Sequence, residues 1–324
     1  MDRQALFSIR TEQEFREQAL EVFRFQAKHC SVYREFLSAL SVQSQDIKDI
    51  GEIPFLPIEF FKRHTVIQTG KEAEIVFYSS GTGGGFTSRH FVHDLQIYNT
   101  SFLNAFRHFY GAIQPYTLLA LLPSYLERQG SSLIYMADTL IKQAGPSSGY
   151  FLHDHEHLYR TLLELQENNK PTILLGVSYA LLDFIETYRL NFPDLIVMET
   201  GGMKGKRKEL IKTELHGQLC RGFGVPAIHA EYGMTELLSQ AYSSGKGRYY
   251  CPPWMQVCIR DLNDPLNILP RGTTGGVNII DLANIHSCSF IATQDLGKVH
   301  EDDSFEILGR YDHSDIRGCN LMIS

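Results

Sequence analysis

The sequence predicts an α/β protein with mostly parallel, helix-covered sheets and a β-rich subdomain that closes the chain. Two observations carry this prediction. Between residues 116 and 232, strand-length apolar runs alternate with helical runs, which is the order of parallel strands joined by helices. After about residue 245, short strand-like runs follow one another with no long helical run between them.

The chain is expected to divide into three consecutive parts. Residues 1–70 form a helical and extended segment that packs on the main body, residues 71–245 form an α/β core, and residues 246–324 form the β-rich subdomain with its tail. In the first part, Thr11 and Glu14 have the spacing of a capping box, so a helix is expected to begin there.

The remaining elements follow from their patterns. The run at 51–64, which prolines interrupt, predicts an extended segment, and the run at 74–80 predicts a strand that enters a glycine-rich loop. Further strands are predicted at 116–122, 172–175, 195–199 and 228–232, and in MQVCIRD, GGVNIID and SFEILGR of the last part. Helices are predicted at 132–144, 155–169, 179–190 and 206–220.

Composition narrows the class of protein. The chain has 324 residues, 43% hydrophobic and 21% charged, which is ordinary for a globular protein with a large core. The net charge of −7 argues against a nucleic-acid or membrane-surface partner. No apolar run approaches the roughly 20 residues of a membrane span, and the N-terminus lacks an apolar signal core, so a cytoplasmic location is expected. The six cysteines form no CxxC pair, which predicts reduced thiols.

A glycine-rich loop is the first candidate site. The stretch FYSSGTGGGFTSRHFVHD at 77–94 places four glycines between Gly81 and Gly85, with hydroxyl side chains around them and Arg89 after them. Glycine lets backbone N–H groups converge on an anion, and arginine matches phosphate geometry. Neither a Walker loop nor a GxGxxG fingerprint fits the spacing. A flexible surface turn remains the alternative at this point.

Three further motifs add to the glycine loop. EYGMTE at 231–236 follows a predicted strand, TQDLG at 293–297 presents a single aspartate, and LGRYDHSDIRGCNL at 308–321 carries an Arg–x–Asp unit. Each motif alone is weak evidence. Their order and spacing together favour a nucleotide site in the core.

With these motifs the chain resembles the adenylate-forming enzymes, the superfamily of acyl-CoA synthetases, luciferase and nonribosomal adenylation domains. SSGTGGG, YGMTE, TQDLG and GRYDHSDIRG are similar to that superfamily's phosphate loop, YGxTE, TGD and hinge motifs. Within it, IPFLPIEFFK and the C-terminal DIRGCNLMIS are most similar to the LuxE-type acyl-protein synthetases. The resemblance covers about residue 50 to residue 324.

The resemblance implies a reaction and a role for each motif. The carboxylate of a small-molecule acid, expected to be a fatty acid, would attack the α-phosphate of ATP and give an acyl-adenylate and pyrophosphate. Positive charge and N–H donors would have to surround the phosphates. The residues implied for the phosphates are Ser79, Ser80, Gly81, Thr82, Gly83 and Gly84, with Arg89 in place of the usual lysine.

The other motifs would hold the remainder of the nucleotide. Glu236 would bind Mg²⁺, with Thr235 beside it in the same motif. Tyr232 would stack on adenine, whose other face the Gly201–Gly202 turn would cover. The last two implied ligands are Asp295, which would accept hydrogen bonds from the ribose hydroxyls, and Arg310, which would reach the ribose or a phosphate.

The match ends just after the hinge motif, so the resemblance implies an adenylate-forming N-terminal domain without the usual small C-terminal domain. In the LuxE-like branch the acyl group passes to a cysteine near the C-terminus, which is Cys319 here, and then to a partner reductase or acyl carrier. Arg317 would favour its thiolate form. Two alternatives stay open: transfer of the adenylate to CoA, a carrier protein or an amine, and a nucleotide- or acyl-binding module without activity.

Two charged runs are assigned no site. HDHEH at 153–157 is interpreted as a solvated helix start with Asp154 as its N-cap rather than a metal cluster. KGKRK at 204–208 is interpreted as a solvated helix entry rather than a pyrophosphate site. No GxSxG elbow is present, which gives hydrolase chemistry little support.

Overall fold

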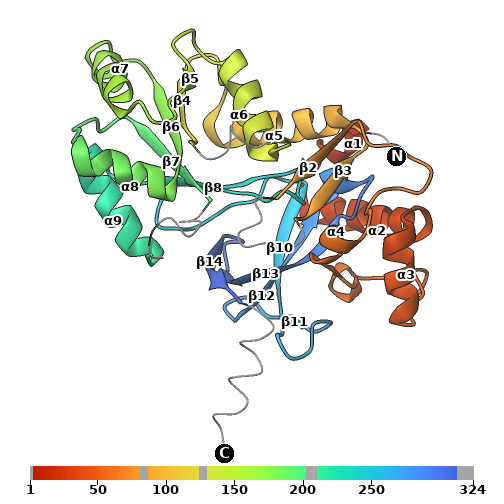
Figure 1. Ribbon diagram of the computed structural model, residues 1–324. Coiled ribbons are helices and arrows are strands. Elements are labelled where there is room, and N and C mark those ends of the chain that lie inside the picture. Colours follow the sequence, from red (N-terminus) through yellow and green to blue (C-terminus); the bar gives the residue numbers. More distant parts are fainter. Residues whose placement is uncertain (1–2, 80–86, 124–129, 202–206, 208–209, 312–324) are drawn as a thin grey trace, which may run out of the picture.

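The computed structural model of the protein describes residues 3–79, 87–123, 130–201, 207 and 210–311. In this part of the chain, two six-stranded sheets and a two-stranded hairpin carry the helices. Figure 1 shows α7 (His155–Glu167), α8 (Ser178–Thr187) and α9 (Lys212–Phe223) on one side of the molecule and the N-terminal helices on the other, with the sheet that contains the C-terminal strands between them. The predicted α/β class, with a β-rich C-terminal part, is confirmed.

The first sheet is mostly parallel, as the sequence predicts. Its order is β5-β4-β6-β7-β8-β9, and only β9 runs antiparallel to its neighbour. Strands β4 and β6 are buried along their whole length, because helices cover both faces of a parallel sheet. The bounds are β4 (Thr117–Leu121), β5 (Gly149–Tyr150), β6 (Thr172–Val177), β7 (Ile196–Thr200), β8 (His229–Tyr232) and β9 (Ala241–Ser243).

The helices of this region turn their apolar stripes toward the sheet. They are α5 (Leu95–Tyr110), α6 (Ser132–Gln143), α7 (His155–Glu167), α8 (Ser178–Thr187) and α9 (Lys212–Phe223). Asp154 caps α7 by accepting a hydrogen bond from the His157 N–H at 3.0 Å, as predicted.

The predicted start of α9 at residue 206 is wrong. The helix begins at Lys212, and the preceding Arg207 lies in a bend where its guanidinium binds the carboxylates of Asp183 and Glu186 on α8. These two ion pairs fix Arg207 against α8 and so favour the bend over a further helical turn. The helix ends at Gly224, whose φ of 68° forms a left-handed C-cap.

Helices α8 and α9 pack so closely that α9 tolerates no side chain at Gly222. A Cβ atom there would lie 2.6 Å from Cβ of Ile185. We expect Gly222→Ala to lower the free energy of unfolding by about 1–3 kcal/mol, because the two helices must move apart. On the same helix, a Cβ at Gly217 meets nothing closer than 3.6 Å, so Gly217→Ala is expected to raise stability by about 0.5–1 kcal/mol. Urea unfolding of both variants is the measurement, and equal effects would contradict the packing argument.

The second sheet joins an early strand of the chain, β1, to the strands of its last part. It has the order β1-β13-β12-β10-β11, and β14 pairs with β13. All pairings are antiparallel except that of β1 with β13, where Leu56 lies opposite Ile291. The bounds are β1 (Leu56–Pro57), β10 (Met255–Arg260), β11 (Ile268–Leu269), β12 (Thr274–Asp281), β13 (Phe290–Val299) and β14 (Phe305–Arg310), and the 3₁₀ helix η2 (Leu282–Asn284) lies between β12 and β13.

The N-terminal helices pack against this second sheet. Thr11 and Glu14 form the predicted capping box at the start of α2. The buried amide of Gln26, on α2, donates hydrogen bonds to the backbone carbonyls of Asn284 and Ile285. The elements are α1 (Arg3–Leu6), α2 (Glu12–His29), α3 (Ser31–Ala39), η1 (Ile50–Glu52) and α4 (Phe60–Arg63), which directly follows β1.

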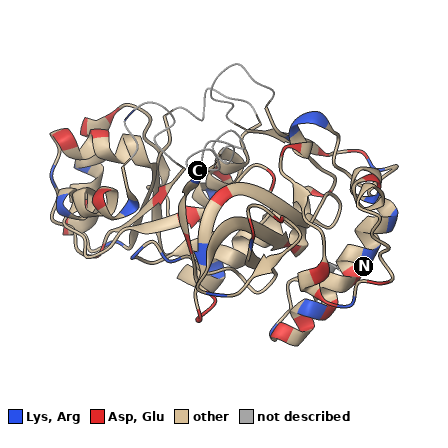
Figure 2. Cartoon of the chain, turned by 90° about the horizontal axis from the view of Figure 1, so that it is seen from below, with Lys and Arg blue, Asp and Glu red and all other residues tan. Residues whose placement is uncertain are grey.

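A hairpin of β2 (Ile75–Tyr78) and β3 (Arg89–Val92) carries the glycine-rich loop at its end. Charged residues of both signs are interspersed along the outer helices (Figure 2). Among the described residues, no helix combines the length and the apolar character that a bilayer crossing requires.

Candidate functional site

The base of the glycine loop lies beside the YGMTE motif. Ser79 and Ser88 close the loop with two hydrogen bonds: the Ser79 N–H donates to the Ser88 carbonyl at 3.1 Å, and the Ser88 N–H donates to Ser79 Oγ at 2.9 Å. The Ser88 hydroxyl in turn donates to the carboxylate of Glu236. A continuous set of hydrogen bonds therefore connects the loop entrance to Glu236.

Glu236 is a buried carboxylate, with 5% of its surface exposed. Burial raises its pKa, because the ionised form loses its hydration. The Ser88 hydroxyl, its own backbone N–H and the cations Arg310 and Lys62 oppose this increase. A carboxylate that is desolvated and surrounded in this way is suited to bind a cation that enters with a ligand.

The aromatic and acidic residues of two other motifs meet in a second group. The Tyr232 hydroxyl at the end of β8 donates a hydrogen bond to Asp295 Oδ2 at 2.7 Å, and Arg310 Nε lies 3.2 Å from Asp295 Oδ1. Burial raises the pKa of Asp295, and Tyr232 and Arg310 oppose that increase. The pairing of β13 with β14 sets this geometry, since Asp295 lies directly opposite Arg310 in the register.

Arg310 links this group to Glu236. Its side chain is 70% exposed and acts electrostatically on both Glu236 and Asp295. An exposed cation in such a position can change partners when a charged ligand arrives. The structure thus brings together Ser79, Tyr232, Glu236, Asp295 and Arg310, which are distant in the sequence.

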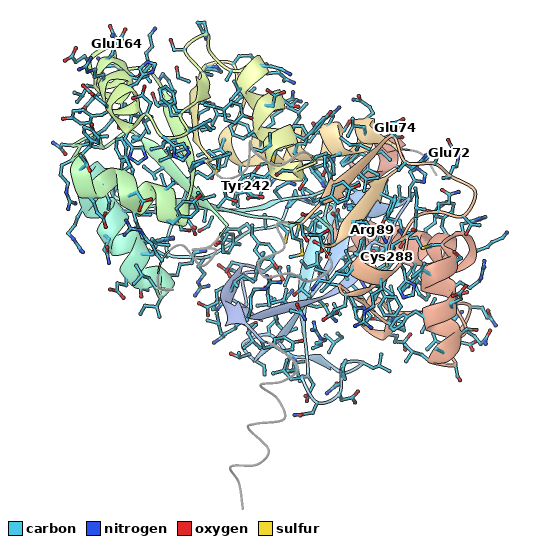
Figure 3. The ribbon with its side chains drawn as sticks, in the orientation of Figure 1. Glu72, Glu74, Arg89, Glu164, Tyr242 and Cys288 are labelled. Atoms are coloured by element: carbon cyan, nitrogen blue, oxygen red, sulfur yellow. The ribbon has the colours of Figure 1, made fainter. Side chains whose placement is uncertain are left out.

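Arg89 is not brought to the same place. It extends from β3 (Figure 3) and its guanidinium lies 5.6 Å from the ring centre of Phe91. Because side chains alternate along a strand, Arg89 points away from the face that carries Ser88 and His90. The second cation that acts on Glu236 is instead Lys62 of α4.

A charged cluster forms around the buried carboxylate of Glu199, near the ends of β7 and β8. Lys212 Nζ lies 2.8 Å from Glu199 Oε1 and 4.7 Å from the ring centre of Tyr249, with which it also forms a hydrogen bond. Burial opposes ionisation of Glu199, but His216 and Lys212 overcome it and hold the pKa near 2. The cluster therefore carries a stable ion pair at the carboxyl edge of the sheet.

This cluster also holds the predicted glycine turn. The Ser178 hydroxyl contacts Glu199 at 2.9 Å and the Gly201 carbonyl at 3.1 Å. Gly201 has a φ of 67°, which glycine adopts without strain. Tyr249 packs 5.8 Å from Tyr232, so the turn, the ion pair and the predicted adenine-stacking ring form one assembly.

Some predicted residues lie outside the described part of the chain. These are Ser80, Gly81, Thr82, Gly83, Gly84, Gly202 and Cys319. Thr235 is described, and its carbonyl accepts a hydrogen bond from His90 Nδ1 at 2.8 Å.

Sequence patterns missed several residues of this region. Lys62 stands at the end of the quoted IPFLPIEFFK run, but nothing local shows that it faces Glu236. Ser88 lies in the glycine stretch, directly before the strand that begins at Arg89. Because side chains alternate along a strand, the sequence could have indicated that Ser88 and Arg89 point to opposite faces. Glu199 and Lys212 belong to no motif, and the single available signal is a glutamate inside an otherwise apolar strand.

Comparisons with curated proteins identify relatives of one kind. The chain is 25% identical over 318 residues to the long-chain-fatty-acid–luciferin-component ligase of Vibrio harveyi, and the match covers 90% of this chain and 82% of the relative. It is 42% identical over 67 residues to the protein of the same name from Photorhabdus luminescens, which covers 20% of this chain and 56% of that one. No family model matches the chain.

Solved structures agree at the level of the fold. A 2-hydroxyisobutyryl-CoA ligase with bound R3-HIB-AMP matches with a TM-score of 0.68 at 14% identity, over 93% of this chain and 68% of that one. ATP-bound MatB from Rhodopseudomonas palustris matches with a TM-score of 0.54 at 20% identity, over 72% of this chain. The match spans about half, 47%, of the MatB chain. The resemblance read from the motifs is therefore confirmed: the chain is LuxE-like in sequence and has the fold of the adenylate-forming ligases.

Proposed function

We propose that this protein activates a carboxylic acid with ATP as an acyl-adenylate. The observation that carries the proposal is the hydrogen-bonded connection from Ser79 through Ser88 to Glu236, with Asp295 joined to the same region through Arg310. In the reaction a carboxylate oxygen bonds to the α-phosphorus of ATP, and the bond from that phosphorus to the bridging oxygen breaks and releases pyrophosphate. The ligase names of the relatives and the fold support this chemistry.

The described residues have distinct parts in this proposal. Asp295 keeps acceptor positions for the ribose hydroxyls, because a carboxylate has about four lone-pair sites and Tyr232 and Arg310 use two of them. Tyr232 packs edge-to-face on Phe305, at 5.4 Å and 77°, which steadies the ring that would stack on adenine.

Glu236 fits a magnesium ion that arrives with the nucleotide. Mg²⁺ commonly takes one or two protein carboxylates and completes its shell with phosphate oxygens and water, so a single buried carboxylate is enough. No group of three or more ligating side chains occurs in the described ranges, which agrees with a shared site of this kind. The ion would neutralise charge on the phosphates, while Lys62 and Arg310 supply protein cations nearby.

We further propose a fatty acid as substrate and Cys319 as acceptor. The curated relatives are named for a long-chain fatty acid. A thiolate on Cys319 would attack the acyl carbon and displace AMP, and a partner protein would then receive the acyl group. The other cysteines are poorly suited, because burial raises the pKa of each of them: Cys30, Cys220, Cys251, Cys258 and Cys288.

Exchange of radiolabelled pyrophosphate into ATP tests the first step. A fatty acid is expected to drive the exchange, and ATP binding by calorimetry without exchange for any acid would leave only a binding module.

Hydroxylamine-labile labelling by a radioactive fatty acid tests the second step. Cys319→Ser is expected to abolish the label while Cys220→Ser retains it. AMP release that depends on added CoA, a carrier protein or an amine would replace the thioester with that acceptor.

The two candidate cations can be separated by matched substitutions. Lys62→Met is expected to lower the exchange rate about tenfold or more, because the variant removes a positive charge that acts near Glu236. Arg89→Met is expected to change the rate less than threefold, since its guanidinium lies over Phe91. Initial exchange rates at saturating ATP and acid decide between them. A larger loss for Arg89→Met would return Arg89 to the phosphate role that the motif implies.

A further inference from the structure

The backbone that carries Glu236 is held by side chains from two other elements. His90 Nδ1, on β3, lies 2.8 Å from the Thr235 carbonyl, and Asn284 Nδ2, on η2, donates to the Glu236 carbonyl at 2.8 Å. Asp281, the N-cap of η2, accepts hydrogen bonds from the backbone N–H groups of Leu238 and Ser239, which follow this turn, at 2.8 and 3.0 Å. The carbonyl before the Glu236 Cα atom and the carbonyl after it are therefore both held in place.

The contact of His90 determines which nitrogen carries its proton. A carbonyl oxygen can only accept, so Nδ1 must be the protonated nitrogen. Burial lowers the pKa of His90 to about 4, although Thr235 and Asn284 oppose this, and the ring is neutral at neutral pH. Phe61 of α4 meets the ring edge-on at 5.7 Å and 88°, which holds its orientation.

Packing alone does not account for these two side chains. Both His90 and Asn284 are completely buried. Within the described residues, no group meets His90 Nε2 or Asn284 Oδ1 at ordinary hydrogen-bond geometry, although the Asn284 side chain lies close enough to the ring to raise the pKa of His90. Burying a poorly paired polar atom is unfavourable, and an apolar side chain of similar size would fill the same space without that cost. What each side chain contributes instead is one hydrogen bond to a backbone carbonyl of the turn that carries Glu236.

We infer that His90 and Asn284 are positioning residues that aim the Glu236 carboxylate at a nucleotide-bound cation. The inference rests on the proposed function. With the peptide groups before and after Glu236 fixed, its carboxylate is directed before the ligand arrives, so binding does not have to order the turn. Outer residues that orient a metal ligand commonly change metal affinity by 10- to 100-fold, which sets the size of the expected effect.

Amide substitutions at His90 provide a sharp test. The amide nitrogen of asparagine occupies the place of Nδ1 along the side chain, whereas that of glutamine occupies the place of Nε2. Mn²⁺ is titrated into the full chain with adenosine 5′-(β,γ-imido)triphosphate, and free Mn²⁺ is measured by electron paramagnetic resonance. His90→Leu and His90→Gln are expected to weaken Mn²⁺ binding about tenfold or more, and His90→Asn to stay within about threefold of the parent.

Two controls separate positioning from general destabilisation. Tyr33→Phe removes another buried hydrogen bond, from the Tyr33 hydroxyl to the Pro54 carbonyl at 2.7 Å, and is expected to leave Mn²⁺ binding unchanged. The parent protein is first assayed for pyrophosphate exchange, and a parent without exchange would refute the proposed function itself. With exchange present, equal Mn²⁺ affinity in all His90 variants, or equal loss in the asparagine and glutamine variants, would overturn the positioning role.

Discussion

Glu236→Gln is expected to lower the rate of pyrophosphate exchange by about 10²- to 10³-fold. The substitution keeps the shape of the side chain and its contact with Ser88, but it removes the negative charge that would hold the magnesium of the nucleotide. An amide oxygen is a weaker ligand for a hard cation than a carboxylate. The largest part of the loss is therefore expected in metal-dependent steps.

The same variant is expected to be at least as stable as the parent at pH 7. Burial raises the pKa of Glu236, so the ionised form is less favourable in the folded than in the unfolded chain. That penalty is present above the folded pKa and disappears as the pH falls below the unfolded value of about 4.3. Glu236→Gln should thus gain stability at pH 7, and the gain should vanish near pH 4.

Exchange rates and urea unfolding at both pH values measure these effects. Glu164→Gln is the matched control, because Glu164 lies on α7 at the far side of the molecule (Figure 3). An active Glu236→Gln variant would remove the metal role. A variant that loses activity together with stability at pH 7 would show that the carboxylate has a structural role instead.

The second large effect is expected for Asp295→Ala, which should weaken AMP binding about 100-fold. The carboxylate is proposed to accept bonds from both ribose hydroxyls, and a hydrogen bond to a charged group contributes about 1.5–3 kcal/mol. Tyr232→Phe serves as the comparison, since it removes only the hydroxyl that lies 2.7 Å from Asp295 and keeps the ring. Its effect on AMP binding, measured by calorimetry, should be several-fold smaller.

A ligand without the ribose hydroxyls completes a thermodynamic cycle. In the parent, 2′,3′-dideoxy-AMP should bind much more weakly than AMP. In Asp295→Ala the two ligands should bind almost equally, because the partner of the hydroxyls is gone. If the preference for AMP were the same in both proteins, Asp295 would not contact the ribose.

Local patterns predicted the parallel sheet well. Runs such as TLLAL and TILLGV are buried on both faces, and continuous apolar runs are typical of such strands. Residues 95–110 form α5, a helix that the sequence patterns do not indicate. Aromatic and β-branched residues of modest helix propensity, among them Tyr98 and Thr100, obscure its period, and tertiary packing of Phe102 and Phe106 compensates.

The motifs of the candidate site are visible in the sequence, but the residues that surround them are not. TQDLG and YGMTE are local signals, whereas their junction through Tyr232 and Asp295 joins residues 63 positions apart. Lys62 and His90 reach Glu236 only through the tertiary arrangement of α4 and β3. Arg89 was chosen as the cation because it follows the glycine loop, but the direction of a side chain depends on the strand register, which the motif does not contain.

The parallel pairing of β1 with β13 affects the order in which a newly made chain can fold. Leu56 leaves the ribosome long before its partner Ile291 has been synthesised. The amide of Gln26 likewise waits for the Asn284 carbonyl, 258 residues later. The apolar face of the N-terminal helices must therefore remain uncovered until these later strands have been made, and we expect a chain released before residue 290 to bind chaperones and aggregate.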